Sequence, residues 1–195
     1  MQATPKLYMT LLGCTPIGRL TEQHDIFFGI GNSIQELKPD MYAFWPDGGQ
    51  LHIDSWREVT QVGGYSIAIV PKEEATNTPE KLFFLNLGGY RRGEFEEYHY
   101  KILVVATTMT DAINAAKQTD FYKQWGFKGA VSHIDNKYAL DVDDMHNVED
   151  LLSENLKARY SVRIELNDGA EDELHVGYLK LGKQASPQPS PKERE

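Results

Sequence analysis

Apolar residues fill nearly every position of two short segments, Lys6–Leu12 and Lys81–Leu87. Uninterrupted runs of this kind are typical of strands that are covered on both faces. A glycine-containing loop follows each run, and a second apolar stretch follows the loop, at residues 25–30 and 101–106. The pattern therefore predicts the same strand–loop–strand unit twice, at an offset of 75 positions.

Residue identities repeat together with the hydrophobic pattern. The motif His52-Ile53-Asp54 recurs as His133-Ile134-Asp135, and Tyr65-Ser66-Ile67 recurs as Tyr160-Ser161-Val162. Blocks that match in the same order predict an internal duplication. At the offset of 75, the residues that recur unchanged are Lys6, Leu7, Leu12, Gly13, Gly18, Glu22 and His24.

The helix signals are also duplicated. Ser33-x-x-Glu36 and Thr108-x-x-Asp111 each place a hydroxyl before an acid, which is the pattern that begins a helix. Pro39 lies where the interior of the first helix would be, so we expect this helix to kink or to begin anew there. The predicted fold class is α+β: tandem β-β-α-β-β repeats form a pseudo-two-fold sheet, mainly antiparallel or mixed, with helices packed on one face.

The segment boundaries follow from the repeat. A turn signal, Asn167-Asp168-Gly169, precedes an alternating segment that is typical of a strand. The C-terminal tail is rich in proline, serine and charge, and such a composition cannot bury enough apolar surface to fold. We expect a first repeat at 1–75, a second repeat at 76–166, an extra strand within 167–183 and a disordered tail at 184–195, the two repeats forming one compact unit.

The composition is that of a folded, water-soluble chain: 195 residues, 41% hydrophobic and 25% charged. The formal net charge of -9, with scattered lysines and arginines, argues against a nucleic-acid partner. Leu11-Leu12-Gly13-Cys14 has the form of a lipoprotein signal ending, but the same strand recurs in mid-chain, where no signal peptide can lie. Since Cys14 is the single cysteine, we expect a cytoplasmic protein without an internal disulfide and without membrane association.

Histidines and carboxylates alternate at matched positions of the two copies. On an extended chain, residues two apart share a face, so each histidine has a carboxylate as its neighbour. The pairs are Glu22 with His24 and His52 with Asp54 in the first copy, and Glu97 with His99 and His133 with Asp135 in the second.

Three interpretations of these pairs stay open. The histidines can be structural, each donating a ring N–H to a carboxylate or a loop carbonyl. They can form a ligand or divalent-metal pocket, with His24, His52 and Asp54 as metal candidates, because histidine with carboxylate suits zinc, iron or manganese. His24 can also act as a general base oriented by Glu22 or Asp54.

The function that these observations favour is binding without catalysis. We expect a module that binds a small molecule or a partner protein, as a monomer with pseudo-dimeric repeats or as a homodimer. The alternative is a metal-dependent or acid–base enzyme that uses Glu22, His24, Asp25, His52 and Asp54. No cofactor is strongly implied, although a divalent metal is compatible with the residues.

One combination of motifs resembles a known family. Glu22-x-His24-Asp25, a proline-containing helix that ends at Trp45, and Leu51-His52-Ile53-Asp54-Ser55-Trp56 are similar to a small bacterial family called domain of unknown function 1543. The resemblance is close over residues 6–70 and looser over 81–165. It implies one or two domain copies per chain and adds Ser55 and Trp56 to the binding candidates. It implies no activity, and because Tyr100 and Asn136-Lys137 depart from the pattern, the first copy is the better candidate site.

Overall fold

The computed structural model describes residues 4–134 and 146–182. The chain divides into two compact units, residues 1–58 with 173–195 and residues 59–172. Asp135, which the sequence offers as a binding candidate, lies outside the described residues. The tail at 184–195, which the sequence predicts to be disordered, also lies outside them.

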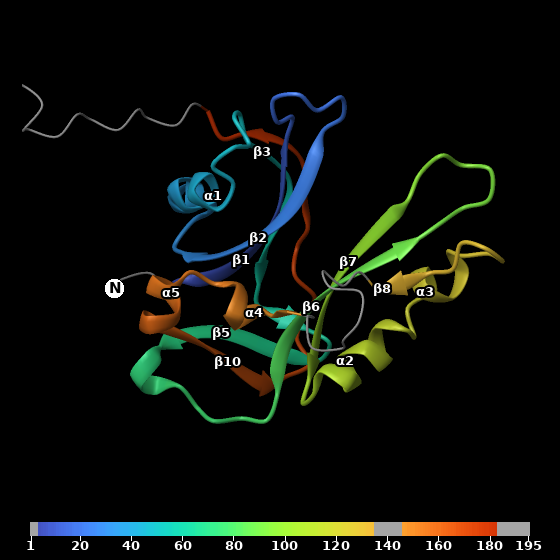
Figure 1. Cartoon of the computed structure of the whole chain (residues 1–195). Coiled ribbons are helices and arrows are strands. Elements are labelled where there is room, and N and C mark those ends of the chain that lie inside the picture. Colours follow the sequence, from blue (N-terminus) through green and yellow to red (C-terminus); the bar gives the residue numbers. More distant parts are fainter. Residues whose placement is uncertain (1–3, 135–145, 183–195) are drawn as a thin grey trace, which may run out of the picture. The chain divides into compact units, whose positions relative to one another are not determined.

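The first unit contains a sheet of four strands: β1 (Lys6–Cys14), β2 (Gln23–Gly31), β3 (His52–Val59) and β11 (His175–Lys180). Their order is β11-β3-β1-β2 (Figure 1). β1 and β2 form an antiparallel hairpin that pairs Lys6 with Gly31 and Cys14 with Gln23. β11 pairs antiparallel with β3, and the pairing is irregular between Val176 and Leu179. The C-terminal strand β11 therefore completes the sheet of the first unit.

A short helical segment covers one face of this sheet (Figure 1). It begins as a 3-10 helix, η1 (Ile34–Leu37), and continues as α1 (Lys38–Phe44). Pro39 lies in the first turn of α1, where its missing N–H costs no helical hydrogen bond. The expectation that the helix begins anew near Pro39 is therefore confirmed. The core that it forms with the sheet consists of Tyr8, Leu12, Cys14, Phe27, Ile34, Leu37, Met41, Tyr42, Leu51, Ile53 and Leu181.

The second unit contains two sheets. One consists of β4 (Gln61–Val62), β5 (Tyr65–Pro71) and β10 (Tyr160–Leu166), in the order β10-β5-β4. The other has the order β7-β6-β8, and β9 also pairs with β6. Its strands are β6 (Lys81–Gly89), β7 (Tyr98–Ala106), β8 (His133–Ile134) and β9 (His146–Asn147).

Helices α2 (Met109–Ala116) and α3 (Asp120–Gln124) pack on the sheet that contains β6 and β7. Their core contacts bury Phe83, Leu85, Leu87, Ala112 and Ala116. The short helices α4 (Val148–Leu151) and α5 (Glu154–Arg159) come directly before β10. None of the helices in the described ranges is long and apolar enough to cross a membrane.

The fold is mixed α+β with antiparallel strand pairs, as the sequence predicts. The described strands form three sheets, however, where the pattern predicts one. The compact units also follow different boundaries from the sequence repeats. The reason is strand pairing: β11 joins β3 of the first copy, and β5 of the first copy pairs with β10 of the second.

Candidate metal centre

The candidate site is built over a glycine in the middle of the first sheet. β1 lies between β2 and β3, and Gly13 of β1 is directly opposite His24 of β2. A Cβ atom on Gly13 would lie 2.6 Å from Oδ2 of Asp54 and closer still to Nε2 of His52, so the missing side chain leaves the space that these groups occupy. Gly13 therefore allows residues of β2 and β3 to meet across the strand between them.

Four side chains converge above Gly13. Nε2 of His24 lies 3.4 Å from Glu22 Oε2 and 3.1 Å from Asp54 Oδ2. Nε2 of His52 lies 2.9 Å from Glu22 Oε1 and 3.3 Å from Asp54 Oδ1. Each imidazole thus faces both carboxylates, and one donor atom each from Glu22, His24 and His52 falls within a sphere of ligand size, all within 4.8 Å of one another.

The cluster lies on the face of the sheet away from α1. Leu12, Cys14 and Ile53 contribute to the core under α1, and successive side chains of a strand point to opposite faces. Gly13 and His52 therefore face the other way. The side chain of His52 is 5% exposed and that of Asp54 is 26% exposed, whereas those of Glu22 and His24 are 43% and 39% exposed. The site is closed on the β3 side and open to solvent on the β2 side.

Two buried atoms of the cluster lack a directed hydrogen bond. Among the residues that the structure describes, His52 Nε2 and Asp54 Oδ2 have neighbours at short distance but none in hydrogen-bonding geometry. A buried polar atom without such a bond costs about 1 to 3 kcal/mol. A cation coordinated by both atoms would remove this cost.

The spacing of the donor atoms is close to that of a coordination sphere. Ligand bonds of about 2.0 to 2.1 Å, as zinc makes to histidine nitrogen and carboxylate oxygen, place neighbouring ligands of a tetrahedron about 3.3 to 3.4 Å apart. The observed distances between nitrogen and oxygen atoms run from 2.9 to 3.4 Å, so two of the four match this spacing and two are shorter. Two nitrogen and two oxygen donors suit zinc, iron or manganese.

β11 supports the buried ligand from the side. The ring of Tyr178 stacks on the ring of His52, with centroids 4.3 Å apart and planes inclined by 29°. Gly177, at φ 146°, lies within the irregular part of β11, and bulges of this kind redirect neighbouring side chains. The sequence predicts the strand but does not show that it pairs with β3, so the role of Tyr178 could not be predicted.

Three residues that the sequence adds to the site lie outside the cluster. Asp25 is exposed, and its Oδ1 accepts a hydrogen bond of 2.7 Å from the backbone N–H of Ile26. Ser55 pairs with Val176 of β11. Trp56 stacks on His175, with ring centroids 3.9 Å apart, and so holds β11 against β3.

Cys14 is next to Gly13 in sequence but belongs to the other face. Its side chain is part of the core under α1. Burial raises the pKa of the Cys14 thiol, and the carboxylates of Asp47 and Glu22 raise it further. The thiol therefore stays protonated at neutral pH, and its place in the core under α1 separates it from the cluster on the opposite face.

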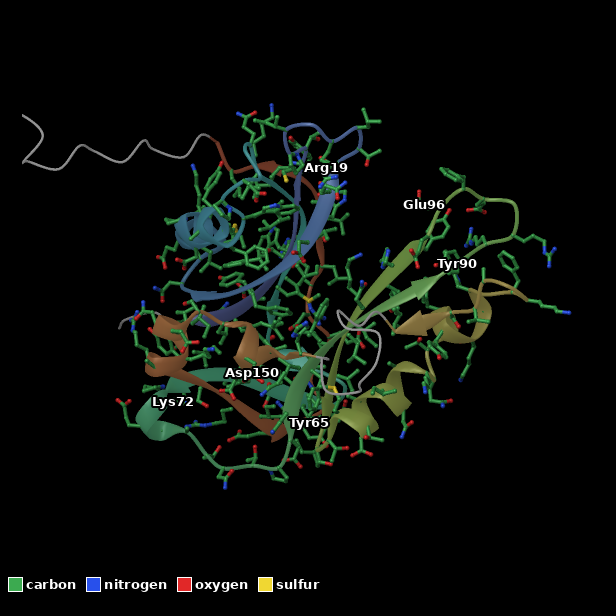
Figure 2. All side chains as sticks on the ribbon, viewed as in Figure 1. Arg19, Tyr65, Lys72, Tyr90, Glu96 and Asp150 are labelled. Atoms are coloured by element: carbon green, nitrogen blue, oxygen red, sulfur yellow. The ribbon has the colours of Figure 1, made fainter. Side chains whose placement is uncertain are left out.

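The strand pairs around Gly88 have the same register as those around Gly13. Gly88 is opposite His99 of β7 and also opposite His133 of β8. Nδ1 of His99 lies 3.1 Å from Nδ2 of Asn86. The Tyr90 hydroxyl, labelled in Figure 2, donates a hydrogen bond of 2.6 Å to Glu97.

Residues 19–69 match the family model of DUF1543, a domain of unknown function. This interval includes all four side chains of the cluster. The match does not extend over the second copy, so the two tandem copies expected from the sequence are not established by it.

One solved structure shares the fold. It is described as the crystal structure of a protein Il1583 from Idiomarina loihiensis, is 23% identical, and has a TM-score of 0.59 over 92% of this chain and 99% of that chain. No curated protein matches this chain. The comparisons therefore support a domain of unknown function and a fold, and assign no activity.

Proposed function

We propose that this chain is a metal-binding protein whose first copy binds one divalent transition-metal ion through Glu22, His24, His52 and Asp54. The observation that carries the proposal is the convergence of both imidazole Nε2 atoms on both carboxylates above Gly13. Zinc is the first candidate, because it accepts mixed nitrogen and oxygen ligands in tetrahedral geometry.

A set of structural ion pairs is the main alternative. In that case protonated histidines would hold the two carboxylates, and the site would need no metal. The two buried atoms without directed hydrogen bonds favour the metal, because an ion-pair network of this kind is stable when its members are hydrogen-bonded.

Metal content of the purified protein tests the proposal. Tag-free protein is stripped with a chelator, dialysed against Zn²⁺ and analysed for bound metal. The His24→Ala, His52→Ala double variant is expected to bind one equivalent less than the wild type. His146 is exposed and lies outside the cluster, so His146→Ala is the matched control and should lose nothing. Equal metal content in the wild type and the double variant would refute the proposal.

Gly13→Ala tests the geometry while keeping all four ligands. The added methyl group would occupy the space of His52 Nε2, so we expect the affinity for Zn²⁺ to fall at least about tenfold, as it does when ligands lose their supporting groups. Zn²⁺ should raise the thermal midpoint of the wild type more than that of the variant at the same concentration, because stabilisation by binding to the native state grows with affinity. A wild-type affinity in Gly13→Ala would contradict the proposed position of the ion.

A metal-dependent enzyme is a second candidate function. It is favoured by the 43% and 39% exposure of Glu22 and His24, which leaves the β2 side of the site open to solvent. Catalytic zinc sites keep a position for water, whereas structural ones are closed by four protein ligands. For catalysis, a substrate would have to displace Glu22 or Asp54 from the ion. Hydrolysis of model esters that a chelator abolishes would favour this candidate over binding alone.

We also infer a tandem repeat from the backbone. β1 and β6 have the same burial pattern, and the two hairpins have the same register, since Lys6–Gly31 and Lys81–Ala106 differ by 75 at both ends. Gly18 and Gly93 occupy equivalent turns with φ of 82° and 84°. The pairing of β5 with β10 supports a pseudo-two-fold relation, because Tyr65 with Leu166 and Pro71 with Tyr160 are exchanged when the copies are exchanged.

We also propose a cytoplasmic location and no nucleic-acid partner. A cytoplasmic location is supported by Cys14, which is a free, buried thiol. The absence of a nucleic-acid partner is supported by the net charge of -9.

A further inference from the structure

A pocket in the second unit is lined mainly by aromatic side chains. It lies between the first residues of β7 and helix α3, which packs beside the hairpin of β6 and β7 (Figure 1). Its volume of about 590 Å³ falls within the range of about 300 to 1,000 Å³ that is typical of small-molecule sites. The rings that line it are those of Tyr98, Tyr100, Phe121 and Trp125.

A glycine makes room for the helical side of this pocket. At the offset of 75 positions, Gly89 stands where Cys14 fills the core under α1. A Cβ atom on Gly89 would lie 2.9 Å from Cζ of Phe121 and 2.9 Å from Cβ of Trp125. Because real Cβ atoms do not approach other atoms so closely, only glycine lets these two residues pack against the end of β6.

The strand side of the pocket is also aromatic only at this sheet. Tyr98 and Tyr100 of β7 stand where β2 has Gln23 and Asp25 at the same offset. Residues two apart on a strand share a face, so both tyrosines are presented on one side of β7. The hairpin of β6 and β7 thus carries an aromatic wall where the hairpin of β1 and β2 carries polar groups.

The four rings hold one another in place. Phe121 stacks on Tyr100 and on Trp125, with centroids 5.4 and 4.9 Å apart and planes inclined by 26° in both pairs. Tyr98 meets Trp125 edge to face, at 4.8 Å and 80°. These are the geometries that aromatic pairs prefer. The wall is therefore formed before a ligand binds, and Tyr100, at 46% exposure, leaves part of it open to solvent.

The same aromatic cluster already holds one cation of the chain. The guanidinium carbon of Arg91 lies 3.9 Å from the ring centroid of Trp125 and 5.7 Å from that of Tyr98. Arg91 does not line the pocket, and its charge is offset by Glu94, whose Oε1 lies 4.0 Å from Nη1 of Arg91. The negative faces of these rings thus attract positive charge in this molecule.

Asp120 supplies a carboxylate to the pocket wall. Its side chain is exposed and, within the described ranges, has neither a hydrogen-bond nor an ion-pair partner. The neighbouring Thr119 hydroxyl, in contrast, is used by the helices, because it donates to the Ala116 carbonyl at 2.8 Å and accepts from the Tyr122 N–H at 3.3 Å. A carboxylate beside ring faces attracts a cation and repels an anion, so charge complementarity selects a positively charged ligand.

We propose that this pocket binds a small organic cation, of the class of the methylated ammonium ions. The ring faces of Tyr98, Tyr100 and Phe121 contact its methyl groups, and Asp120 offsets its charge. Methylated ammonium ions fit this wall because apolar methyl groups surround the charge and can pack on aromatic faces. The proposal is independent of the proposed metal site, since none of these residues belongs to the cluster above Gly13.

Binding of choline to the full-length, tag-free protein tests the proposal. The chain has three tryptophans, so its heteronuclear NMR spectrum contains three indole N–H signals, and Trp125→Phe identifies the one from Trp125. We expect choline to shift this signal in a saturable way. The neutral isostere dimethylbutanol, in which carbon replaces the charged nitrogen, should bind at least about fivefold more weakly, which is the size of one cation–π contact.

Two variants separate the charge of the pocket from its rings. Asp120→Asn keeps the shape and should weaken choline about two- to fivefold, the worth of an exposed ion pair. Tyr100→Leu keeps an apolar side chain at a partly exposed position and should weaken choline at least about fivefold. Asp150→Asn is the matched control, because Asp150 is an exposed acid in the first turn of another short helix, α4, and lies outside the pocket.

The outcomes that would overturn the proposal are specific. Equal affinities for choline and dimethylbutanol would show an apolar pocket that does not select charge. An unmoved Trp125 signal at saturating choline would show that the cation does not bind there. Wild-type affinity in both Asp120→Asn and Tyr100→Leu, with folding verified by circular dichroism, would place the ligand elsewhere.

Discussion

At the scale of single residues, Gly13 contributes by having no side chain. The sequence places this residue in the glycine-containing loop after Leu12. In the structure β1 continues to Cys14, because Gly13 and Cys14 still pair with His24 and Gln23. The close approach is that of His52 and Asp54 from the neighbouring strand. Hydrophobic pattern alone could not show this extension, since neither glycine nor cysteine marks a strand.

Tyr8 has a pH dependence that can be measured. Burial raises its pKa, and so does the Glu58 carboxylate, which accepts a hydrogen bond of 3.1 Å from the Tyr8 hydroxyl; together they bring the pKa to about 12. The native state therefore favours the neutral phenol. The stability that this provides is complete below the ordinary tyrosine pKa of about 10, and it is lost as the pH rises from there toward 12. We expect a late step in the spectrophotometric titration of the folded protein.

The Tyr8→Phe variant assigns that step. It should remove the late increase in tyrosinate absorbance and reduce the loss of stability at alkaline pH. Tyr178→Phe, at a residue that is 63% exposed, is the control and should leave the late step in place. A late step that persists in Tyr8→Phe would show that another tyrosine is responsible.

At the scale of elements, one sequence signal gave two different helix starts. Thr108 forms the expected cap, because its hydroxyl accepts a hydrogen bond of 3.1 Å from the N–H of Asp111. Ser33 makes no such bond. There the Glu36 carboxylate accepts hydrogen bonds from Asn32, and the segment begins as a 3-10 helix before Pro39 starts α1. The same four-residue pattern thus predicts where a helix begins without fixing its cap.

Thr108→Ala should destabilise the protein by about 1 kcal/mol, the usual value of a threonine cap. Thr110 is exposed within α2, and Thr110→Ala is the control that removes a threonine without removing a cap. Chemical denaturation measures both. Unfolding midpoints that agree for the two variants would contradict the cap.

The stabilisation by the Thr108 cap also depends on pH. The Thr108 hydroxyl, followed by that of Thr107, holds the pKa of Asp111 below its usual range. The stabilisation is therefore present above the ordinary aspartate pKa and is lost as the pH falls through the lowered value. We expect the difference between Thr108→Ala and the wild type to shrink in acid.

The two residue pairs of the candidate site could be predicted from the sequence, but their convergence could not. The alternation of a strand pairs Glu22 with His24 and His52 with Asp54 from sequence alone. Their meeting requires β1 to lie between β2 and β3, and strand order is a property of long-range pairing that a periodic pattern does not contain. The contribution of Tyr178 was hidden for the same reason, because nothing local connects β11 to β3.

At the scale of the whole molecule, the chain passes between its two compact units twice, after Glu58 and after Asp172. Within the second unit these two points are tied together. The Asp172 carboxylate accepts hydrogen bonds from the Thr60 N–H at 3.0 Å, the Thr60 hydroxyl at 2.6 Å and the Gln61 N–H at 3.0 Å. The Asp172 side chain therefore ties the segment that ends at Asp172 to the segment that follows Glu58, at the start of β4.

Asp172→Ala should lower the free energy of unfolding by about 1.5 kcal/mol, the lower end of the range for hydrogen bonds to a charged group, because Thr60 is exposed. Glu171→Ala, at the exposed preceding residue, is the matched control. Urea denaturation followed by tryptophan fluorescence measures both variants. A midpoint for Asp172→Ala equal to that of Glu171→Ala would show that the carboxylate does not hold these segments.

The boundaries of the two compact units were the part of the fold that the sequence predicted least well. Repeated motifs predict that two segments share a structure, but they do not state which strands pair across the copies. Here β5 and β10 pair with each other, and β11 is added to the first sheet, so the compact units cut across the sequence repeats. The local pattern predicts the strand–loop–strand units, and the pairing of distant strands decides their register and the sheets that they join.

The ladder of β5 and β10 bears on how folding depends on protein concentration. Without its partner, each of the two strands would leave an unpaired edge that another chain can occupy. In a chain that carried only one of them, the ladder would form between two molecules, and stability would then depend on concentration. Here both strands belong to one chain, so their pairing is intramolecular and independent of dilution.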